Sequence, residues 1–204
     1  MAPFTVLHVC MGNICRSPMA ERLLVRAVRD RVKALVPAFD DALDPLVHSH
    51  SAGTGGWHAG EEMNPPAARQ VRARGGEAAG FAARKLRGDH IDEADLVLTA
   101  TSDQLDYVLA LRPDAGTRTF VLGEFGRLLG GLDPAGLPAA DPTPDAVYAR
   151  GTAIVLAADE HRAGGPPRPG DDLDDPWGRG DQTFTRIGDE IEDVVVPFAA
   201  LLLP

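Results

Sequence analysis

Cys10-Met11-Gly12-Asn13-Ile14-Cys15-Arg16-Ser17 is the stretch that decides the fold of this 204-residue chain. The apolar run 4–9 before it predicts a buried strand, and the segment 18–35 after it has the apolar spacing of a helix. The stretch is therefore a tight loop between a strand and a helix. Such a junction directs loop N–H groups and the positive end of the helix dipole towards one point, which favours binding of a tetrahedral dianion.

Two side chains in this loop carry chemistry. A thiol beside a helix N-terminus and a guanidinium loses its proton easily, so we expect Cys10 to be a thiolate near neutral pH. Arg16 offers a planar fork of donors to two phosphate oxygens. We expect Ser17 to cap the helix and Pro18 to be its first residue. An inert, buried Cys10 is the alternative, but it leaves the rest of the stretch unexplained.

The longer run Val9-Cys10-x-Gly12-Asn13-x-Cys15-Arg16-Ser17-Pro18-x-Ala20-Glu21 resembles the signature loop of the low-molecular-weight protein tyrosine phosphatase family. The resemblance continues at 51–54 with Trp57 and Gly60, at 82–86, at 94–98 and at 175–178. It covers about residues 4–128 and 172–203 and implies a phosphotyrosine phosphatase I-like fold. The chain departs from the family's usual pattern at Ala100-Thr101, where Met-Asp is common, and at Asn64, where an acidic residue is common.

Alternation of predicted strands and helices points independently to an α/β fold. Strands are predicted at 4–9, 46–51, 94–99 and 118–122, and helices at 18–35, 65–74, 102–111, 145–162 and 182–203. This order predicts an open, mostly parallel four-stranded sheet with helices on both faces and a ligand site beyond the carboxyl ends of the strands. Pro197 should kink or shorten the last helix.

Length and composition limit the organisation of the protein. We expect one phosphatase domain, 1–204, with a Gly/Pro-flanked insertion at about 130–171. The net charge of −10 argues against nucleic-acid and membrane partners, and neither a spanning segment nor a signal peptide is evident. Both cysteines lie in the loop, which favours a reducing compartment and hence the cytoplasm. We expect a monomer or weak homodimer.

The chemistry expected of the loop is phosphoryl transfer through a phosphocysteine. Cys10 would attack phosphorus, while Arg16 and the backbone of residues 11–16 hold the oxygens. Ser17 would donate to the sulfur, and the resemblance implies that the hydroxyl of Ser51 holds the Asn13 side chain. The expected substrate-binding residues are Met11, Gly12, Asn13, Ile14, Cys15, Ser17, Trp57 and Trp177. Cys10 and Cys15 would form a reversible disulfide under peroxide, unless Cys15 is only a buried structural thiol.

A proton donor for the leaving group must come from elsewhere in the chain. The resemblance implies Asp175, which Pro176 and Trp177 follow, with Asp174 as the alternative; the acidic run 171–175 can also be read as a solvated loop. Trp57 and Trp177 would flank a slot for a phenyl ring. This scheme requires no metal and no cofactor, and the expected substrate is a phosphotyrosine protein or a small phosphate ester.

Three other functions stay open at this point. An arsenate reductase of the same fold would need an external thiol, because the chain has no third cysteine for an internal relay. A phosphatase acting on a small metabolite fits the same loop. A non-catalytic anion-binding module, with the 130–171 insertion as its working part, is disfavoured by the intact set of Cys10, Arg16 and Asp175.

Overall fold

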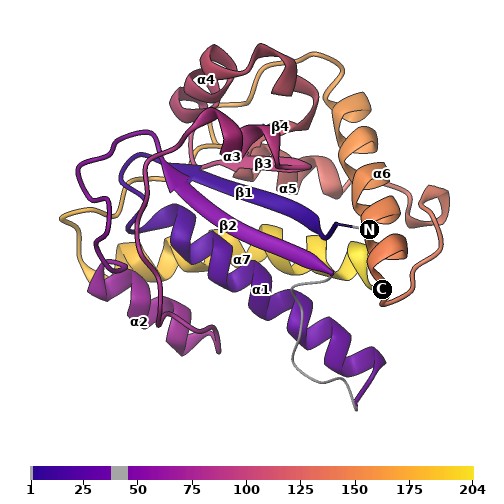
Figure 1. Cartoon of the computed structure of the whole chain (residues 1–204), viewed down its shortest axis with the longest axis horizontal. Helices are drawn as coiled ribbons and strands as arrows, with labels where there is room; N and C mark the ends of the chain where they lie inside the picture. The colour runs from indigo at the N-terminus through magenta and orange to yellow at the C-terminus, as the bar shows by residue number, and fades with distance from the viewer. Residues whose placement is uncertain (1, 38–45) are drawn as a thin grey trace.

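A four-stranded parallel sheet forms the centre of the computed structural model, which describes residues 2–37 and 46–204 (Figure 1). Its strand order is β2-β1-β3-β4, and Cys10 lies opposite Gly53 where β1 and β2 end. The strands are β1 (Phe4–Cys10), β2 (Val47–Gly53), β3 (Leu96–Thr99) and β4 (Thr119–Val121). The predicted open α/β sheet is confirmed, and all of its described pairings are parallel.

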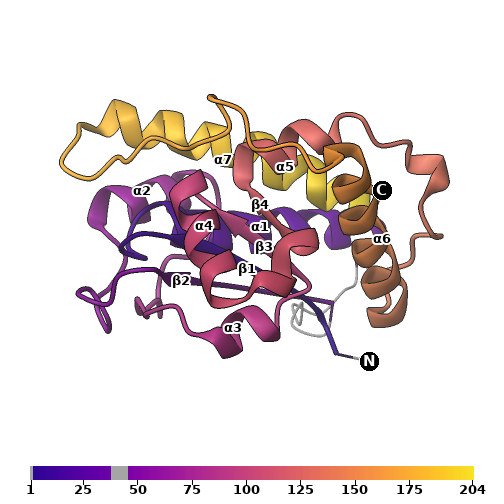
Figure 2. The ribbon, with the colours of Figure 1, turned by 90° about the horizontal axis from the view of Figure 1, so that it is seen from above.

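Helices cover both faces of the sheet, as Figure 2 shows from above. Val6 and Leu98 face the larger core, together with buried residues of α1, α5 and α7, whereas Leu7 and Val97 face a smaller core under α3 and α4. The bounds of these helices are α1 (Arg16–Leu35), α3 (Gly88–Asp92), α4 (Ser102–Leu111), α5 (Leu122–Leu129) and α7 (Asp181–Leu202). The alternation of strand residues between two apolar cores explains why β1 is buried throughout most of its length.

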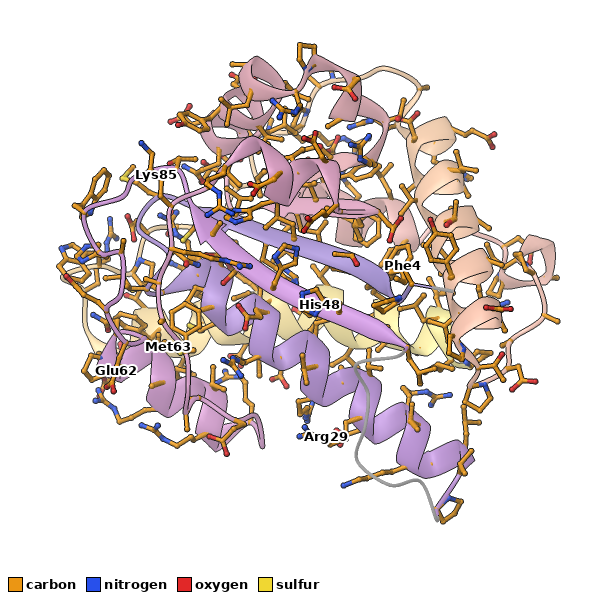
Figure 3. All side chains as sticks on the ribbon, viewed as in Figure 1. Phe4, Arg29, His48, Glu62, Met63 and Lys85 are labelled. Carbon is orange, nitrogen blue, oxygen red and sulfur yellow. The ribbon has the colours of Figure 1, made fainter. Side chains whose placement is uncertain are left out.

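The remaining elements lie around this core and are α2 (Pro65–Ala73), η1 (Pro113–Arg118), η2 (Pro134–Gly136) and α6 (Pro144–Arg162). Helix α6 lies beside the two chain ends, far from the carboxyl ends of the strands (Figure 1). Phe4 marks this end of β1 in Figure 3, and Lys85 marks the opposite end. Across the described parts of the chain, no helix combines the length and apolar character that a membrane crossing requires.

The sequence prediction missed α3 and α5. Helix α3 has only five residues, and α5 contains Gly123 and Gly126, which disfavour a helix in isolation. Tertiary packing explains both glycines, because an added Cβ would lie 2.5 Å from the Asp171 carbonyl oxygen at Gly123 and 2.6 Å from Val194 at Gly126. The two positions are glycine because their neighbours approach too closely for a larger residue.

The predicted start of one helix was wrong, and of the two effects expected of Pro197, a kink or a shortened helix, the shortening does not occur. Helix α1 begins at Arg16 with Cys15 flanking it, so Ser17 lies inside the first turn and is not the cap. Pro18 is tolerated there because the first N–H groups of a helix have no intrahelical partner. Helix α7 continues through Pro197 to Leu202 and is not cut short; Pro197 faces solvent, where water can bind the carbonyl of Asp193 that loses its donor.

Candidate active site

The loop after β1 lies at the carboxyl end of the sheet, at the point where the chain order changes direction between β1 and β3. Ligands of open α/β sheets bind at such switch points. Hydrogen bonds fix the outer side of the loop: the carbonyl oxygens of Cys10 and Met11 accept from Thr54 and Gly55, at 2.9 Å each, and that of Ile14 accepts from Asn64 at 2.9 Å. The loop is thus held by segments that follow β2.

Because a trans peptide is planar, each N–H points away from the carbonyl of the preceding residue. The N–H groups of Met11, Gly12 and Cys15 therefore point towards the inside of the loop, opposite the carbonyls that are tied outward. The first turn of α1 is buried directly behind them. Together they form an anion-binding cradle of backbone donors at a helix N-terminus.

The Cys10 side chain lies buried at the base of this cradle. Its sulfur is 3.0 Å from Ser17 Oγ and accepts a hydrogen bond from the Asn13 N–H at 3.3 Å. Ser17 Oγ already accepts from the Asn13 side-chain amide at 2.9 Å, so its own hydrogen is free to point at the sulfur. Two donors are therefore available to one sulfur.

Asn13 holds the loop in its tight conformation. It is buried and has a φ of 55°, in the left-handed region that asparagine tolerates better than most residues. Its amide nitrogen donates to Ser51 Oγ at 2.8 Å, the contact that the resemblance implies, and its Oδ1 accepts from the Arg84 N–H at 2.8 Å. Ser51 in turn donates to Glu21 at 2.6 Å, and burial raises the pKa of that carboxyl despite this hydrogen bond.

Arg16 is buried between the loop and a distant segment. Its Nη1 donates to the carbonyl of Leu173 at 3.1 Å, and its Nη2 lies 3.0 Å from a carboxylate oxygen of Asp175. Within the described chain its buried Nε has no hydrogen-bond partner. The guanidinium therefore joins the anion cradle to the segment that carries the expected proton donor.

Each aspartate of the 171–175 run has its own partner. Asp172 accepts from the N–H and hydroxyl of Ser102, Asp174 pairs with Arg186 at 2.6 Å, and Asp175 pairs with Arg16 while accepting from the Trp177 N–H at 3.2 Å. Asp171, by contrast, is buried against α5. The run is thus an anchored loop, and only Asp175 of the four lines the cleft over Cys10.

That cleft has a volume of about 250 Å³. Trp57 and Trp177 line it while remaining 64% and 56% exposed, so both indoles are available to a ligand. The complete lining comprises Cys10, Met11, Gly12, Ile14, Cys15, Arg16, Trp57, His58, Asp175 and Trp177. The structure therefore brings the predicted nucleophile, guanidinium, proton donor and both tryptophans to one site.

The sequence analysis missed His58. Its ring lies 5.5 Å from the ring of Trp177 and 6.2 Å from that of Trp57, and it lines the cleft beside Gly12. Glu61 holds its Nδ1 at 2.7 Å, which fixes the ring orientation. Adjacency to Trp57 was the available signal, but neighbouring residues in a loop need not face the same way.

Cys15 differs from Cys10 although both thiols are free and buried. Burial raises the pKa of Cys15 to about 12, with the charges of Cys10 and Asp175 adding to the effect of burial. Cys15 is thus a neutral thiol at physiological pH. In residues 2–37 and 46–204 no group of three or more His, Cys, Asp or Glu side chains could hold a metal ion.

Comparison with known proteins agrees with this geometry. The family model of the low molecular weight phosphotyrosine protein phosphatases matches residues 5–131, the larger part of the chain. The chain belongs to this family, and it is accordingly a phosphatase. The fold and the position of the loop at the end of β1 are those that the resemblance implied.

Individual relatives differ in the substrate that their names state. A low molecular weight protein-tyrosine-phosphatase of Streptomyces coelicolor is 37% identical over 145 residues, which cover 71% of this chain and 79% of that protein. A protein-arginine-phosphatase of Geobacillus stearothermophilus is 34% identical over 123 residues, covering 60% and 72%. The solved structure of the arginine phosphatase YwlE from the same species superposes with a TM-score of 0.62 at 25% identity, covering 97% of this chain and 92% of that one.

Proposed function

We propose that this protein hydrolyses phosphotyrosine in proteins through a phosphocysteine on Cys10, without a metal ion. The observation that carries the proposal is the single cleft that contains the Cys10 sulfur, the Arg16 guanidinium and the Asp175 carboxyl. A nucleophile, a charge-neutralising donor set and a proton donor are the three parts that ester phosphoryl transfer needs.

The reaction begins when the phosphate enters the cradle and Arg16 exchanges the carboxylate of Asp175 for two phosphate oxygens. The Cys10 thiolate then attacks phosphorus in line with the ester oxygen, and the S–P bond forms as the O–P bond breaks. Released from Arg16, the Asp175 carboxylate takes up a proton from solvent and gives that proton to the departing oxygen. It next takes a proton from water, whose oxygen attacks the phosphocysteine, while Ser17 stabilises the returning thiolate.

The walls of the cleft favour an aryl ester. Met11 and Ile14 contribute apolar surface, and the exposed indoles of Trp57 and Trp177 suit the two faces of a flat ring. Because Cys10 lies buried at the base, a phosphate must reach past these side chains. Phosphotyrosine has that length, whereas phosphoserine is shorter by a whole ring.

Phosphoarginine is the second candidate, because one relative and one similar structure carry that activity in their names. A phosphoguanidinium group presents several N–H donors, which need acceptors along the walls. Among the described residues that line the cleft, only Asp175 supplies a carboxylate. This balance favours the aryl substrate.

The proposal has corollaries for the rest of the chain. We infer a single phosphatase domain, 1–204, that works in the cytoplasm, where a reducing environment keeps Cys10 a free thiol. Sedimentation velocity tests the expected monomer or weak homodimer.

Parallel kinetics on matched substrates test the function. The same peptide is prepared with phosphotyrosine, phosphoserine or phosphoarginine and assayed in the presence of EDTA, beside a panel of sugar phosphates and arsenate with a thiol. We expect kcat/KM for the phosphotyrosine peptide to exceed the others by at least tenfold, with a phosphocysteine trapped at Cys10 by acid quench. Faster turnover of phosphoarginine, of a sugar phosphate or of arsenate contradicts the substrate, and loss of all activity in EDTA contradicts the metal-free mechanism.

A further inference from the structure

Asp171 differs from the other aspartates of its run because its side chain is only 7% exposed. Its carboxylate accepts two hydrogen bonds from Arg127 of α5, one from Nε at 3.2 Å and one from Nη2 at 2.8 Å. It accepts a third from the Arg168 N–H at 2.7 Å. Its carbonyl packs against Gly123, where no Cβ fits. A bidentate pair with both backbone and side chain fixed is a built anchor.

This anchor lies at the start of the loop that carries Asp175. The hydrogen bonds found in residues 164–170 are local, ending on Arg162, Arg168 and Asp171, so this Gly/Pro segment gives the loop little other support. Two residues after Asp171, the buried Leu173 donates to the Ala100 carbonyl at 2.8 Å and accepts from Arg16. Asp175 follows two residues later.

We propose that Asp171 and Arg127, here named the α5 clamp, position Asp175 for proton transfer; the inference rests on the proposed function. Helix α5 packs on α7, and Arg127 lies in its last turn, so the position of the guanidinium is set by a packed helix. The clamp fixes the start of the loop against α5. Leu173, two residues later, is bonded to Arg16, so the fixed start also limits where Asp175 lies relative to Arg16. Asp171 is a positioning residue, since it does not line the cleft.

The charge state of Asp171 fits a permanent anchor. Burial tends to raise the pKa of this carboxyl, but the hydrogen bonds from Arg127 and from the Arg168 N–H outweigh burial and leave the pKa below its ordinary value. Asp171 therefore stays ionised and paired throughout the neutral range. The Asp174–Arg186 pair, with both side chains about half exposed, offers a matched control in the same loop.

A leaving-group series in a double-mutant cycle tests the clamp. Asp171→Asn keeps the shape but removes the charge, and we expect kcat/KM to fall about tenfold or more for an unactivated phenyl phosphate and less than twofold for a nitrophenyl phosphate. In the Asp175→Asn background the same substitution should cost no further activity, because the clamp acts through the missing acid. Arg127→Gln should repeat the pattern, and Asp174→Asn should not. Equal losses for all leaving groups, or losses that add to Asp175→Asn, overturn the proposal.

Amide hydrogen exchange of residues 171–177 separates failure of the clamp from failure of the proposed function. We expect faster exchange in Asp171→Asn and Arg127→Gln than in wild type or Asp174→Asn, whatever the enzyme hydrolyses. Unchanged exchange overturns the clamp even in an active enzyme. If Asp171→Asn lowers the melting temperature so far that it unfolds during assay, the partly exposed Arg127 carries both measurements.

Discussion

At the scale of single residues, the Cys10 sulfur and the Ser17 hydroxyl form a pair whose chemistry depends on the thiolate. Cys10→Ser keeps the shape of the loop but replaces a thiol by an alcohol that does not ionise near neutral pH. We expect turnover of aryl phosphates to nearly vanish while inorganic phosphate still binds, since the backbone cradle is intact. Steady-state assays and calorimetric titration with phosphate measure the two effects. Substantial turnover in this variant would rule out Cys10 as the nucleophile.

The role of Asp175 is also a matter of a single residue, because the proposal assigns proton transfer to this one carboxyl among the four aspartates of the 171–175 run. Asp175→Asn should slow turnover about a hundredfold or more for esters with poor leaving groups, the usual scale for a positioned general acid. Activated nitrophenyl esters should lose much less, since their leaving group departs without a proton. Asp174→Asn is the control because its side chain pairs with Arg186 outside the cleft. Similar losses in both variants would remove the assignment.

At the scale of elements, α6 is the longest helix of the predicted insertion. It is tied to the sheet by the hydroxyl of Tyr148, which donates to Asp95 at 3.0 Å, and by Arg162, which donates to the Thr119 and Gly116 carbonyls. The Arg162 guanidinium also lies 4.3 Å from the ring centroid of Phe120. These contacts reach β4, η1 and the residue before β3 at the end of the sheet away from Cys10, which indicates a role in stability rather than in chemistry.

Gly151 tests how tightly α6 packs on β1. A Cβ at this position would lie 2.6 Å from the fully buried ring of Phe4, which also contacts Tyr148 and Phe198. We expect Gly151→Ala to destabilise the protein. Overpacking costs about 1–3 kcal/mol of unfolding free energy, which exceeds the gain of about 1 kcal/mol from the higher helix propensity of alanine. Urea unfolding measures the change, and kcat of the folded variant should not move. Gly136→Ala, where the added Cβ meets nothing within 4 Å, is the control; equal stability of the two variants contradicts tight packing.

At the scale of the whole molecule, two buried histidines link stability to pH. Burial is the main cause that lowers the pKa values of His8 and His50 to about 3 each; the charge of His50 lowers that of His8 further, and the charge of Arg84 lowers that of His50 further. Both rings are thus neutral in the folded protein. Below the ordinary value of about 6.5 the unfolded chain takes up protons that the folded chain refuses, so stability is present above pH 6.5 and falls towards pH 3.

The expected slope is up to about 1.4 kcal/mol per pH unit for each histidine between these limits. Replacing His8 by Gln should remove the contribution of one histidine to the dependence of the unfolding free energy on pH, whatever the substitution does to the absolute value of that free energy. Urea unfolding at pH 7.5, 6.5, 5.5 and 4.5 measures it. His161→Gln, on the exposed side of α6, should leave the slope unchanged. A His8 variant with the wild-type slope would show that the folded protein takes up this proton after all.

Contiguous features of this protein could be predicted from the sequence alone. The strand, loop and helix around residues 10–17 follow one another along the chain, so periodicity and residue type located the anion cradle with Cys10 and Arg16 inside it. The alternation of strands and helices likewise predicted the parallel sheet. Both depend on interactions over a few residues, which local patterns record.

The tertiary structure decided what distant segments do to one another. Ser17 has the propensity of a cap, but the hydroxyl is engaged by Cys10 and Asn13, so the helix begins earlier. Helix α5 contains two glycines in spite of their low helix propensity, because Asp171 and Val194 pack closely on them. The position of His58 between the two tryptophans, and the bond from Arg127 to Asp171 across 44 residues, leave no local pattern. Contacts between residues far apart in the chain depend on packing and charge in three dimensions. A short stretch of sequence does not contain both partners, so it cannot predict them.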